Sequence, residues 1–131
     1  MRRSALVTCC VSLVVLFAPI SNADQKPQRI ERHVLMEVTA YCPCSKCCGP
    51  HAHGTTASGR RVTHNDGKFV AADSKLPFGT ELIIPGYADG QAVEVLDRGG
   101  AIKGNRLDVF FPTHKEALKW GRREIEVTVF E

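Results

Sequence analysis

Two aspartates separated by a glycine-rich stretch are the residues of this sequence whose types and spacing best suit acid–base chemistry. Asp97 ends the apolar stretch AVEVLD, and Asp108 follows eleven residues later between two apolar residues. A carboxyl group in a partly apolar cleft has a raised pKa and can stay protonated at neutral pH. Such a group could be the general acid of glycoside cleavage, since the departing sugar oxygen must receive a proton. The alternative is a pair of ordinary aspartates on the solvent face of a strand or in a turn.

The glycines between these aspartates, Gly99 and Gly100, would allow a backbone approach that larger side chains block. No glycine-rich phosphate loop with a Lys-Ser/Thr ending occurs, so nucleotide binding is not indicated. The formal net charge of +3 includes Arg2 and Arg3 and leaves the rest nearly balanced, which gives no support for a nucleic-acid partner.

A second group of reactive residues is the cysteine cluster CPCSKCC, which contains Cys42, Cys44, Cys47 and Cys48. In an oxidising compartment four cysteines favour two disulfides, for which three pairings are open. Zinc is the less favoured alternative, with His51 and His53 as additional ligands, and free or redox-active thiols are the third. We predict no other cofactor.

The N-terminus predicts export. Arg2 and Arg3 precede an apolar run that ends near Ile20, and a small-residue segment up to residue 23 follows, as in a cleaved signal peptide over residues 1–23. The run is short for a membrane-spanning helix, so we expect no stable membrane insertion after cleavage. The remaining 108 residues suffice for one domain. We expect a flexible lead-in over residues 24–33, a domain over residues 34–131, and an exported protein that is periplasmic or extracellular.

Short alternating segments predict the scaffold that must position the aspartates. Six strands are indicated, at HVLMEVTAY, FVAAD, TELIIP, AVEVLD, LDVFF and EIEVTVF. Residues 42–67 read as one long loop. The segment PTHKEALKWG predicts a helix with a Thr113–Glu116 capping box and Gly121 at its end, and Trp120 is expected to pack in the core, with sugar stacking as the alternative. The pattern indicates a mainly-β chain closed into a small barrel with one short helix.

The segments TAYCPCSKCCG, HGTTASG, VAADSKLPFGTEL and VLDRGGAIKGNRLDVFF together resemble the three-aspartate (3D) domain. The resemblance runs from about Val38 to the C-terminus. It extends to stationary-phase survival proteins and to the catalytic core of membrane-bound lytic transglycosylase A. It implies a six-stranded double-psi β-barrel that cleaves peptidoglycan between N-acetylmuramic acid and N-acetylglucosamine and leaves a 1,6-anhydro end.

The resemblance also implies roles for individual residues. The three aspartates that name the family match Asp73, Asp97 and Asp108, and in the transglycosylases the position of Asp108 acts first as acid and then as base. Asp97 would be its electrostatic partner, and Asp73 would hold the loop or a sugar hydroxyl. Further expected substrate contacts are Gly99, Gly100, Lys103, Arg106 and Thr56, with Thr55 and Ser58 as weaker candidates and His64 and His114 as surface residues. The alternative function is a non-catalytic, expansin-like module that binds wall polysaccharide.

Overall fold

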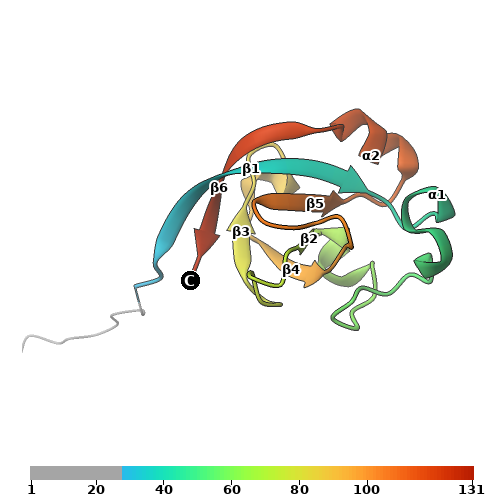
Figure 1. The fold of residues 1–131 in the computed structure, drawn as a ribbon, viewed down its shortest axis with the longest axis horizontal. Helices are drawn as coiled ribbons and strands as arrows, with labels where there is room; N and C mark the ends of the chain where they lie inside the picture. Colours follow the sequence, from blue (N-terminus) through green and yellow to red (C-terminus); the bar gives the residue numbers. More distant parts are fainter. Residues whose placement is uncertain (1–27) are drawn as a thin grey trace, which may run out of the picture.

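The alternating apolar residues pair into a closed barrel in the computed structural model, which describes residues 28–131 (Figure 1). The strand order around the barrel is β1-β5-β2-β4-β3-β6. The strands are β1 (Glu31–Tyr41), β2 (Phe69–Ala72), β3 (Glu81–Ile83), β4 (Val93–Asp97), β5 (Arg106–Phe110) and β6 (Arg123–Phe130). The helical segments are α1 (Ser45–Cys48), α2 (His114–Trp120) and three 3-10 turns, η1 (Gly49–His51), η2 (His64–Gly67) and η3 (Ala88–Gly90).

This architecture confirms the predicted mainly-β barrel, and every predicted strand forms. Two of the pairings are parallel, β1 with β5 and β2 with β4, whereas the other four are antiparallel. Parallel neighbours require the chain to cross over an end of the barrel between them, as the double-psi arrangement does. The crossing connections bring chemically useful residues from distant segments to one end.

The barrel interior is filled by the apolar faces of the strands. Met36 and Val38 of β1 point inward, as their alternation predicts, and both are buried. Tyr87 is the largest of the fully buried side chains, and its hydroxyl donates a hydrogen bond of 2.7 Å to the carbonyl oxygen of Phe110. Each large apolar side chain buried in this way stabilises the fold by about 1.5–3 kcal/mol.

Helix α2 confirms its predicted boundaries and packing. Thr113 Oγ1 accepts a hydrogen bond from the Glu116 amide, and the helix ends at Gly121, whose φ of 71° suits glycine. Trp120 is 6% exposed, and its Nε1 donates to the carbonyl oxygen of Val38, which fixes α2 against β1. The core position predicted for Trp120 is therefore confirmed.

Two boundary predictions were wrong. β1 begins at Glu31, inside the predicted lead-in, because Glu31 pairs with Phe130 of β6 and the lead-in becomes part of the barrel. Residues 42–67 are not one irregular loop, since they contain α1, η1 and η2. The signal peptide predicted over residues 1–23 lies outside the described residues. Within residues 28–131 no helix is both long enough and apolar enough to cross a membrane.

Candidate active site

The two candidate carboxylates lie on strands that flank β2. Asp97 ends β4 and Asp108 lies within β5, and in the strand register both pair with Ala71 of β2. Neighbouring strands are about 4.8 Å apart, so the two aspartate Cα atoms are separated by two such spacings, about 10 Å. The methyl group of Ala71 between them leaves space above the strand, and all three residues line one cavity.

Asp108 has a raised pKa. Burial raises the pKa of its carboxyl from the ordinary 3.8 to about 6, and the negative charge of Asp97 adds to the effect. A hydrogen bond of 3.0 Å from Thr39 Oγ1 to Asp108 Oδ1 and the positive charge of Arg106 oppose it. The result is a carboxyl group that holds a proton up to nearly neutral pH and faces a cavity.

Asp97 is held by three hydrogen bonds. Its Oδ2 accepts from the Tyr41 hydroxyl at 2.5 Å, and its Oδ1 accepts from the amides of Ala57 and Arg98 at 2.8 and 2.9 Å. Burial and the charge of Asp97 raise the pKa of Tyr41, so that Tyr41 remains a neutral donor. Asp97 is thereby fixed in position beside Asp108 and joins the barrel to the segment that contains Ala57.

The cavity above these residues has a volume of about 460 Å³. Its floor contains Tyr41, Ala71, Asp97 and Asp108. One wall comes from residues 43–57 between β1 and β2, including His51 and His53, and another from residues 98–100 after β4. Small-molecule sites in proteins occupy about 300–1,000 Å³, so this space suits a ligand of sugar size.

Gly99 and Gly100 line the cavity, as predicted, but only Gly99 is required by packing. A Cβ atom at Gly99 would lie 2.7 Å from Ile102 Cγ1, whereas a Cβ at Gly100 would meet nothing within 4 Å. Ile102 is buried, so it cannot easily move away. Gly99 therefore keeps this wall close to the barrel.

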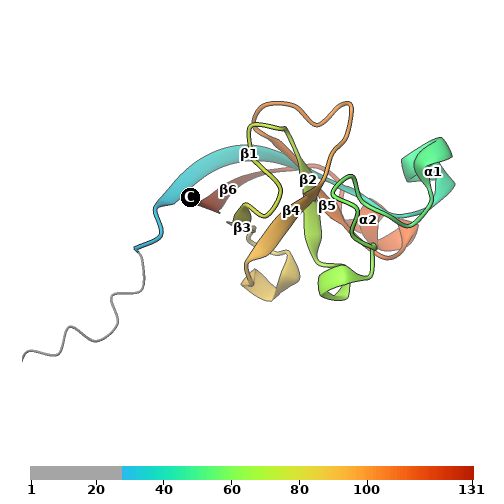
Figure 2. The same cartoon turned by 90° about the horizontal axis from the view of Figure 1, so that it is seen from below.

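The structure places Asp73 outside the cavity lining and in contact with the loop that it was expected to hold, while its predicted membership of the catalytic set stays a prediction. Its Oδ2 accepts from the Gly104 amide at 2.7 Å, and its Oδ1 accepts from the Lys75 amide at 3.0 Å. These hydrogen bonds lower the pKa of Asp73 to about 2. Asp73 thus ties the loop between β4 and β5 to the turn that follows β2, and Figure 2 shows these orange and yellow-green segments beside each other.

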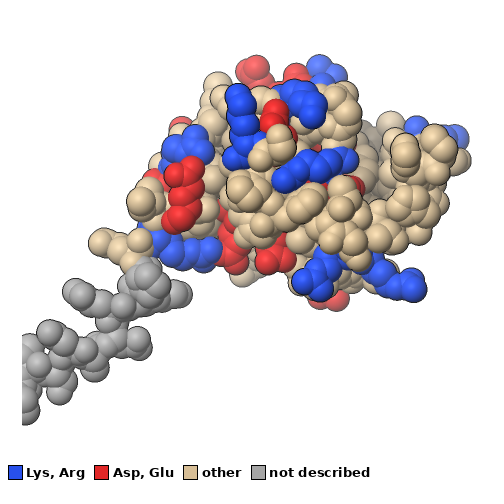
Figure 3. All heavy atoms as spheres, turned by 60° about the horizontal axis from the view of Figure 1, so that its bottom comes forward, with Lys and Arg blue, Asp and Glu red and all other residues tan. Residues whose placement is uncertain are grey.

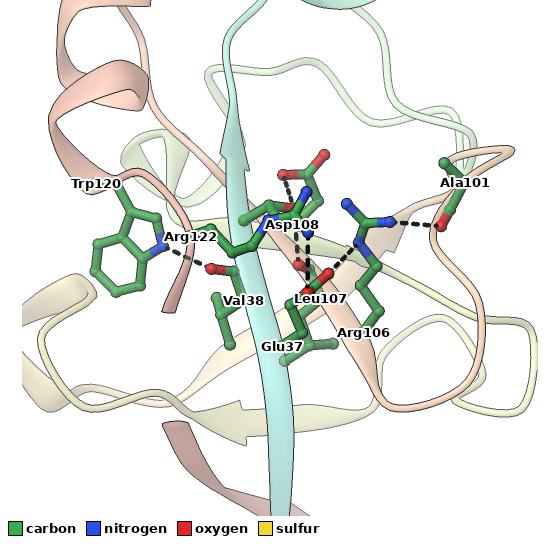
Figure 4. Close-up of polar contacts among 9 residues, drawn as sticks. Glu37, Val38, Ala101, Arg106, Leu107, Asp108, Trp120 and Arg122 are labelled. Atoms are coloured by element: carbon green, nitrogen blue, oxygen red, sulfur yellow. Dashed lines mark hydrogen bonds and ion pairs between the residues drawn. The ribbon is translucent and has the colours of Figure 1, made fainter. Parts of the chain in front are cut away.

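Lys103 and Arg106 do not line the cavity either, and their contacts with substrate stay a prediction. Arg106 Nε lies 3.0 Å from Glu37 Oε1, and its Nη1 donates to the Ala101 carbonyl oxygen. Figure 4 shows the guanidinium turned toward Glu37 and Ala101. The parallel pairing of β1 with β5 sets Glu37 opposite Arg106, and this register draws the side chain to Glu37.

Thr56 does line the cavity, but its hydroxyl has partners within the protein. The side chain is 4% exposed, and Oγ1 both donates to the Arg60 carbonyl oxygen and accepts from the Arg60 amide, at 3.1 Å each. Its third partner is Ser58 Oγ at 3.0 Å. Thr56 therefore shapes the wall, and its neighbour Thr55 also lines the cavity.

Sequence reasoning missed two residues of the floor, Tyr41 and Ala71, and also Thr39, which donates a hydrogen bond to Asp108. Thr39 pairs with Asp108, and Tyr41 reaches Asp97 across the end of the barrel. In HVLMEVTAY, Thr39 and Tyr41 alternate with residues that point into the barrel. This period of two places them on the opposite strand face from Val38, and it was the one sequence signal for their position. Their contact with the aspartates depends on strand order, which alternation does not specify.

The cysteines do not form the predicted disulfides. All four are free thiols, and the Cys42 Sγ lies 3.0 Å from that of Cys44 and 3.2 Å from that of Cys47, beyond the S–S bond length of about 2.05 Å. Cys48 Sγ instead donates to the Cys42 carbonyl oxygen at 3.2 Å. His51 and His53 face the cavity, whereas His114, predicted as a surface residue, lies against the other three sulfurs.

Surface charge is mixed on the face seen in Figure 3. Lysines and arginines are interspersed with acidic side chains there, and the end that carries α1 is largely uncharged. Among the described residues that line the cavity, Arg98 is the one lysine or arginine. The guanidinium of Arg98 donates to the carbonyl oxygens of Leu76 and Asp97. The floor is therefore governed by its two carboxyl groups.

Comparison with known protein families matches the part of the chain that carries the three aspartates. Residues 68–131, which carry β2 to β6 and all three aspartates, match the 3D domain. The chain therefore contains a 3D domain over residues 68–131.

Its relatives include two proteins of Bacillus subtilis (strain 168). YabE, whose name refers to cell wall shaping, is 34% identical over 97 residues, which are 72% of this chain and 23% of YabE. The cell wall-binding protein YocH is 38% identical over 78 residues, or 58% of this chain and 26% of YocH. This chain thus spans about a quarter of the length of these relatives.

The crystal structure of MltA from E. coli is similar to this chain with a TM-score of 0.47 and 27% sequence identity. The similarity covers 59% of this chain and 27% of MltA.

Proposed function

We propose that this protein is a lytic transglycosylase of peptidoglycan, with Asp108 as its general acid and base. One observation carries the proposal: Asp108 combines a pKa near 6 with a place on the floor of a cavity of about 460 Å³. A protonated carboxyl in an accessible cavity is the group that glycosidic bond cleavage needs. The 3D domain and the cell wall names of the two relatives support peptidoglycan as the substrate.

In the first step, protonated Asp108 donates its proton to the oxygen that links N-acetylmuramic acid to N-acetylglucosamine. The bond between that oxygen and the anomeric carbon breaks, and N-acetylglucosamine leaves with a new hydroxyl group. Positive charge then develops on the muramoyl ring, and the fixed Asp97 carboxylate, which lines the same cavity as Asp108, stabilises that charge.

In the second step, the Asp108 carboxylate accepts the proton of the muramoyl 6-hydroxyl. The oxygen of that hydroxyl forms a bond to the anomeric carbon and closes the 1,6-anhydro ring, so Asp108 returns to its protonated form without consuming water. The nucleophile belongs to the same sugar and has a high effective concentration. One titrating carboxyl group therefore suffices, and Asp97 needs no proton-transfer role.

The remaining floor and wall residues position the substrate. Gly99 and Gly100 line the cavity, and at Gly100 the open space beside the backbone lets a bulky glycan approach. Tyr41 and two backbone amides hold Asp97 through three hydrogen bonds, so it does not have to reorganise during the reaction. The substrate lies outside the cytoplasm, and the cell-wall relatives support a periplasmic or wall location for this protein.

The second candidate function is a module that binds wall glycan without cleaving it. The name of YocH, which describes cell wall binding, favours this alternative. In that case the cavity would hold a sugar, and the raised pKa of Asp108 would serve hydrogen bonding to it.

Digestion of purified peptidoglycan distinguishes the two functions. The wild-type protein should release anhydro-muropeptides that mass spectrometry detects, and Asp108→Asn should release almost none while it still sediments with cell wall. Asn retains the acceptor for Thr39, so the variant should fold. Wall binding without any anhydro product from the wild type would favour the binding module, and wild-type product from Asp108→Asn would exclude that residue from the role.

A further inference from the structure

Four potential metal ligands lie close together where β1 ends and α2 begins, and none of them belongs to the cavity floor that contains Asp97 and Asp108. Cys42 follows β1, Cys44 and Cys47 lie at and within α1, and His114 is the first residue of α2. Their ligand atoms all lie within 4.8 Å of one another. Figures 1 and 2 both show α1 and α2 at the same end of the molecule, although 67 residues separate Cys47 from His114.

The distances suit a small tetrahedral site. His114 Nδ1 lies 3.6, 3.7 and 3.4 Å from the sulfurs of Cys42, Cys44 and Cys47. With Zn–S bonds of about 2.3 Å and a Zn–N bond of about 2.0 Å, tetrahedral geometry separates sulfur from nitrogen by about 3.5 Å. The same geometry separates sulfurs by about 3.8 Å, so the observed 3.0 and 3.2 Å would need to widen by less than an ångström.

The ligand set also argues against pairing these cysteines in disulfides. Three sulfurs and one imidazole nitrogen point to a common centre, whereas the fourth sulfur, that of Cys48, is used in a hydrogen bond to a carbonyl oxygen. Two disulfides would require all four sulfurs to meet in pairs. Three thiolates and one imidazole form a ligand set that proteins use for structural zinc.

We propose that Cys42, Cys44, Cys47 and His114 bind one zinc ion. Four protein ligands fill the tetrahedral coordination of zinc, so the site has no open position for substrate and is structural. The ion joins α1 to the start of α2 and thereby closes a long loop of the chain, which stabilises the folded state.

Zinc here also fixes one wall of the active-site cavity. Cys47 belongs to that wall together with Pro43, Cys48, His51 and His53, and all of them lie within the segment that the ion anchors. No extensive apolar core holds this segment, since no residue of α1 or η1 is buried. The site is independent of the proposed glycan chemistry, because neither aspartate of the floor belongs to it.

The first test measures metal and thiols in the full chain, expressed with its own N-terminus and purified without chelator or reductant. We expect about one zinc ion per chain by elemental mass spectrometry. Because Cys9 and Cys10 add two thiols to the full chain, thiols are counted in the peptide that contains CPCSKCC, where we expect four that react after denaturation and chelation. Absence of zinc together with absence of reactive thiols would overturn the proposal in favour of disulfides. Absence of zinc with four reactive thiols would overturn it as well.

Matched variants test the ligand set. Cys47→Ser and His114→Ala should lose the zinc, whereas Cys48→Ser and His51→Ala should retain it, because Cys48 and His51 are near the site but outside it. His114→Cys should restore zinc, since a fourth thiolate can replace the imidazole. Retention of zinc by both Cys47→Ser and His114→Ala, or its loss from His51→Ala alone, would contradict the assignment.

A spectroscopic measurement on the wild-type chain avoids dependence on variant folding. After zinc is exchanged for Co²⁺, the chain should show the d–d absorption of tetrahedral cobalt together with thiolate-to-cobalt charge transfer of an intensity expected for three thiolates. Chelation should remove these bands and lower the melting temperature, and added zinc should restore that temperature. An octahedral cobalt spectrum, or no thiolate charge transfer, would overturn the site.

Discussion

Asp108 and Asp73 are residues of one type whose surroundings shift their pKa values in opposite directions. Asp108 lies on the cavity floor, where burial dominates and one hydrogen bond from Thr39 opposes it, so its pKa rises to about 6. Asp73 lies at the loop anchor, where amides of Gly104 and Lys75 donate to its carboxylate and its pKa falls to about 2. Donors and burial, rather than the residue type, therefore decide which aspartate can deliver a proton.

The two sites are connected through one loop. Residues 98–100 at its start line the cavity, and Gly104 near its end is held by Asp73. Asp73 thus supports the cavity without lining it, so of the three aspartates that match the family signature only Asp97 and Asp108 line this cavity.

The largest expected difference between the two aspartates is in activity. Asp108→Asn should lower the rate of anhydro-muropeptide release by about 100-fold or more, because general acid–base catalysis contributes about 10²–10⁴-fold. Asp73→Asn should retain most of the rate once the amount of folded protein is matched by circular dichroism. Equal losses in the two variants would abolish the functional distinction between the sites.

The pH dependence of cleavage should follow Asp108 and not Asp73. Since the acid must be protonated, kcat/KM should fall by about tenfold per pH unit above about pH 6. The descending limb should keep its midpoint in Asp73→Asn, whose carboxyl in the wild type is already ionised across this range. A flat profile between pH 5 and about 8 would contradict the role of Asp108.

Stability should change with opposite sign at the two sites. The folded pKa of Asp108 exceeds the unfolded value of 3.8, so its ionisation costs folded-state stability increasingly above pH 3.8 and fully above about 6. Asp108→Asn should therefore raise the free energy of unfolding at about pH 8 by about 3 kcal/mol, because the pKa shift exceeds two units and one unit corresponds to about 1.4 kcal/mol.

Asp73 has a folded pKa below its unfolded value, so it stabilises the fold above pH 3.8 and loses that effect as the pH falls through about 2. Asp73→Asn should lower the free energy of unfolding at neutral pH, because one of its oxygens becomes an amide group that faces a backbone donor. Urea titrations of both variants at the same pH measure how each substitution changes the free energy of unfolding. Changes in the same direction for the two variants would contradict the comparison.

The smallest expected effect concerns the loop between the two sites. Gly99→Ala would place a Cβ atom 2.7 Å from Ile102 Cγ1 and should destabilise the protein by about 1–3 kcal/mol. Gly100→Ala meets open space and should change stability by less than about 0.5 kcal/mol. Thermal unfolding of this pair shows whether the cavity wall depends on close packing, and similar melting temperatures would show that it does not.

Local pattern predicted much of the fold. The period of two in HVLMEVTAY and EIEVTVF placed Met36 and Val127 in the core, and the Thr113–Glu116 capping box located α2. The aspartates were found because Asp97 and Asp108 lie beside apolar segments and match a family signature. Each of these signals is contained in a few consecutive residues.

Contacts that depend on strand order were beyond the sequence. Nothing near Arg106 in the chain indicates that β1 would set Glu37 opposite it, so the ion pair between these two residues was not predicted. His114 was missed as a neighbour of the cysteines because it lies 67 residues from Cys47, in a helix whose local pattern suggests only a surface position. Contacts of this kind join segments that are distant in the chain. They form only when the barrel closes, so they depend on which strands pair and in which register.

Titration of the aspartate side-chain carboxyl carbons by NMR tests the central claim most directly, because it measures the proton affinity of Asp108 without requiring substrate. We predict a midpoint near pH 6 for Asp108 and near 2 for Asp73, with Asp108→Asn used to assign the first signal. A midpoint for Asp108 at or below the ordinary 3.8 would leave it without a proton to donate at neutral pH and would contradict the account.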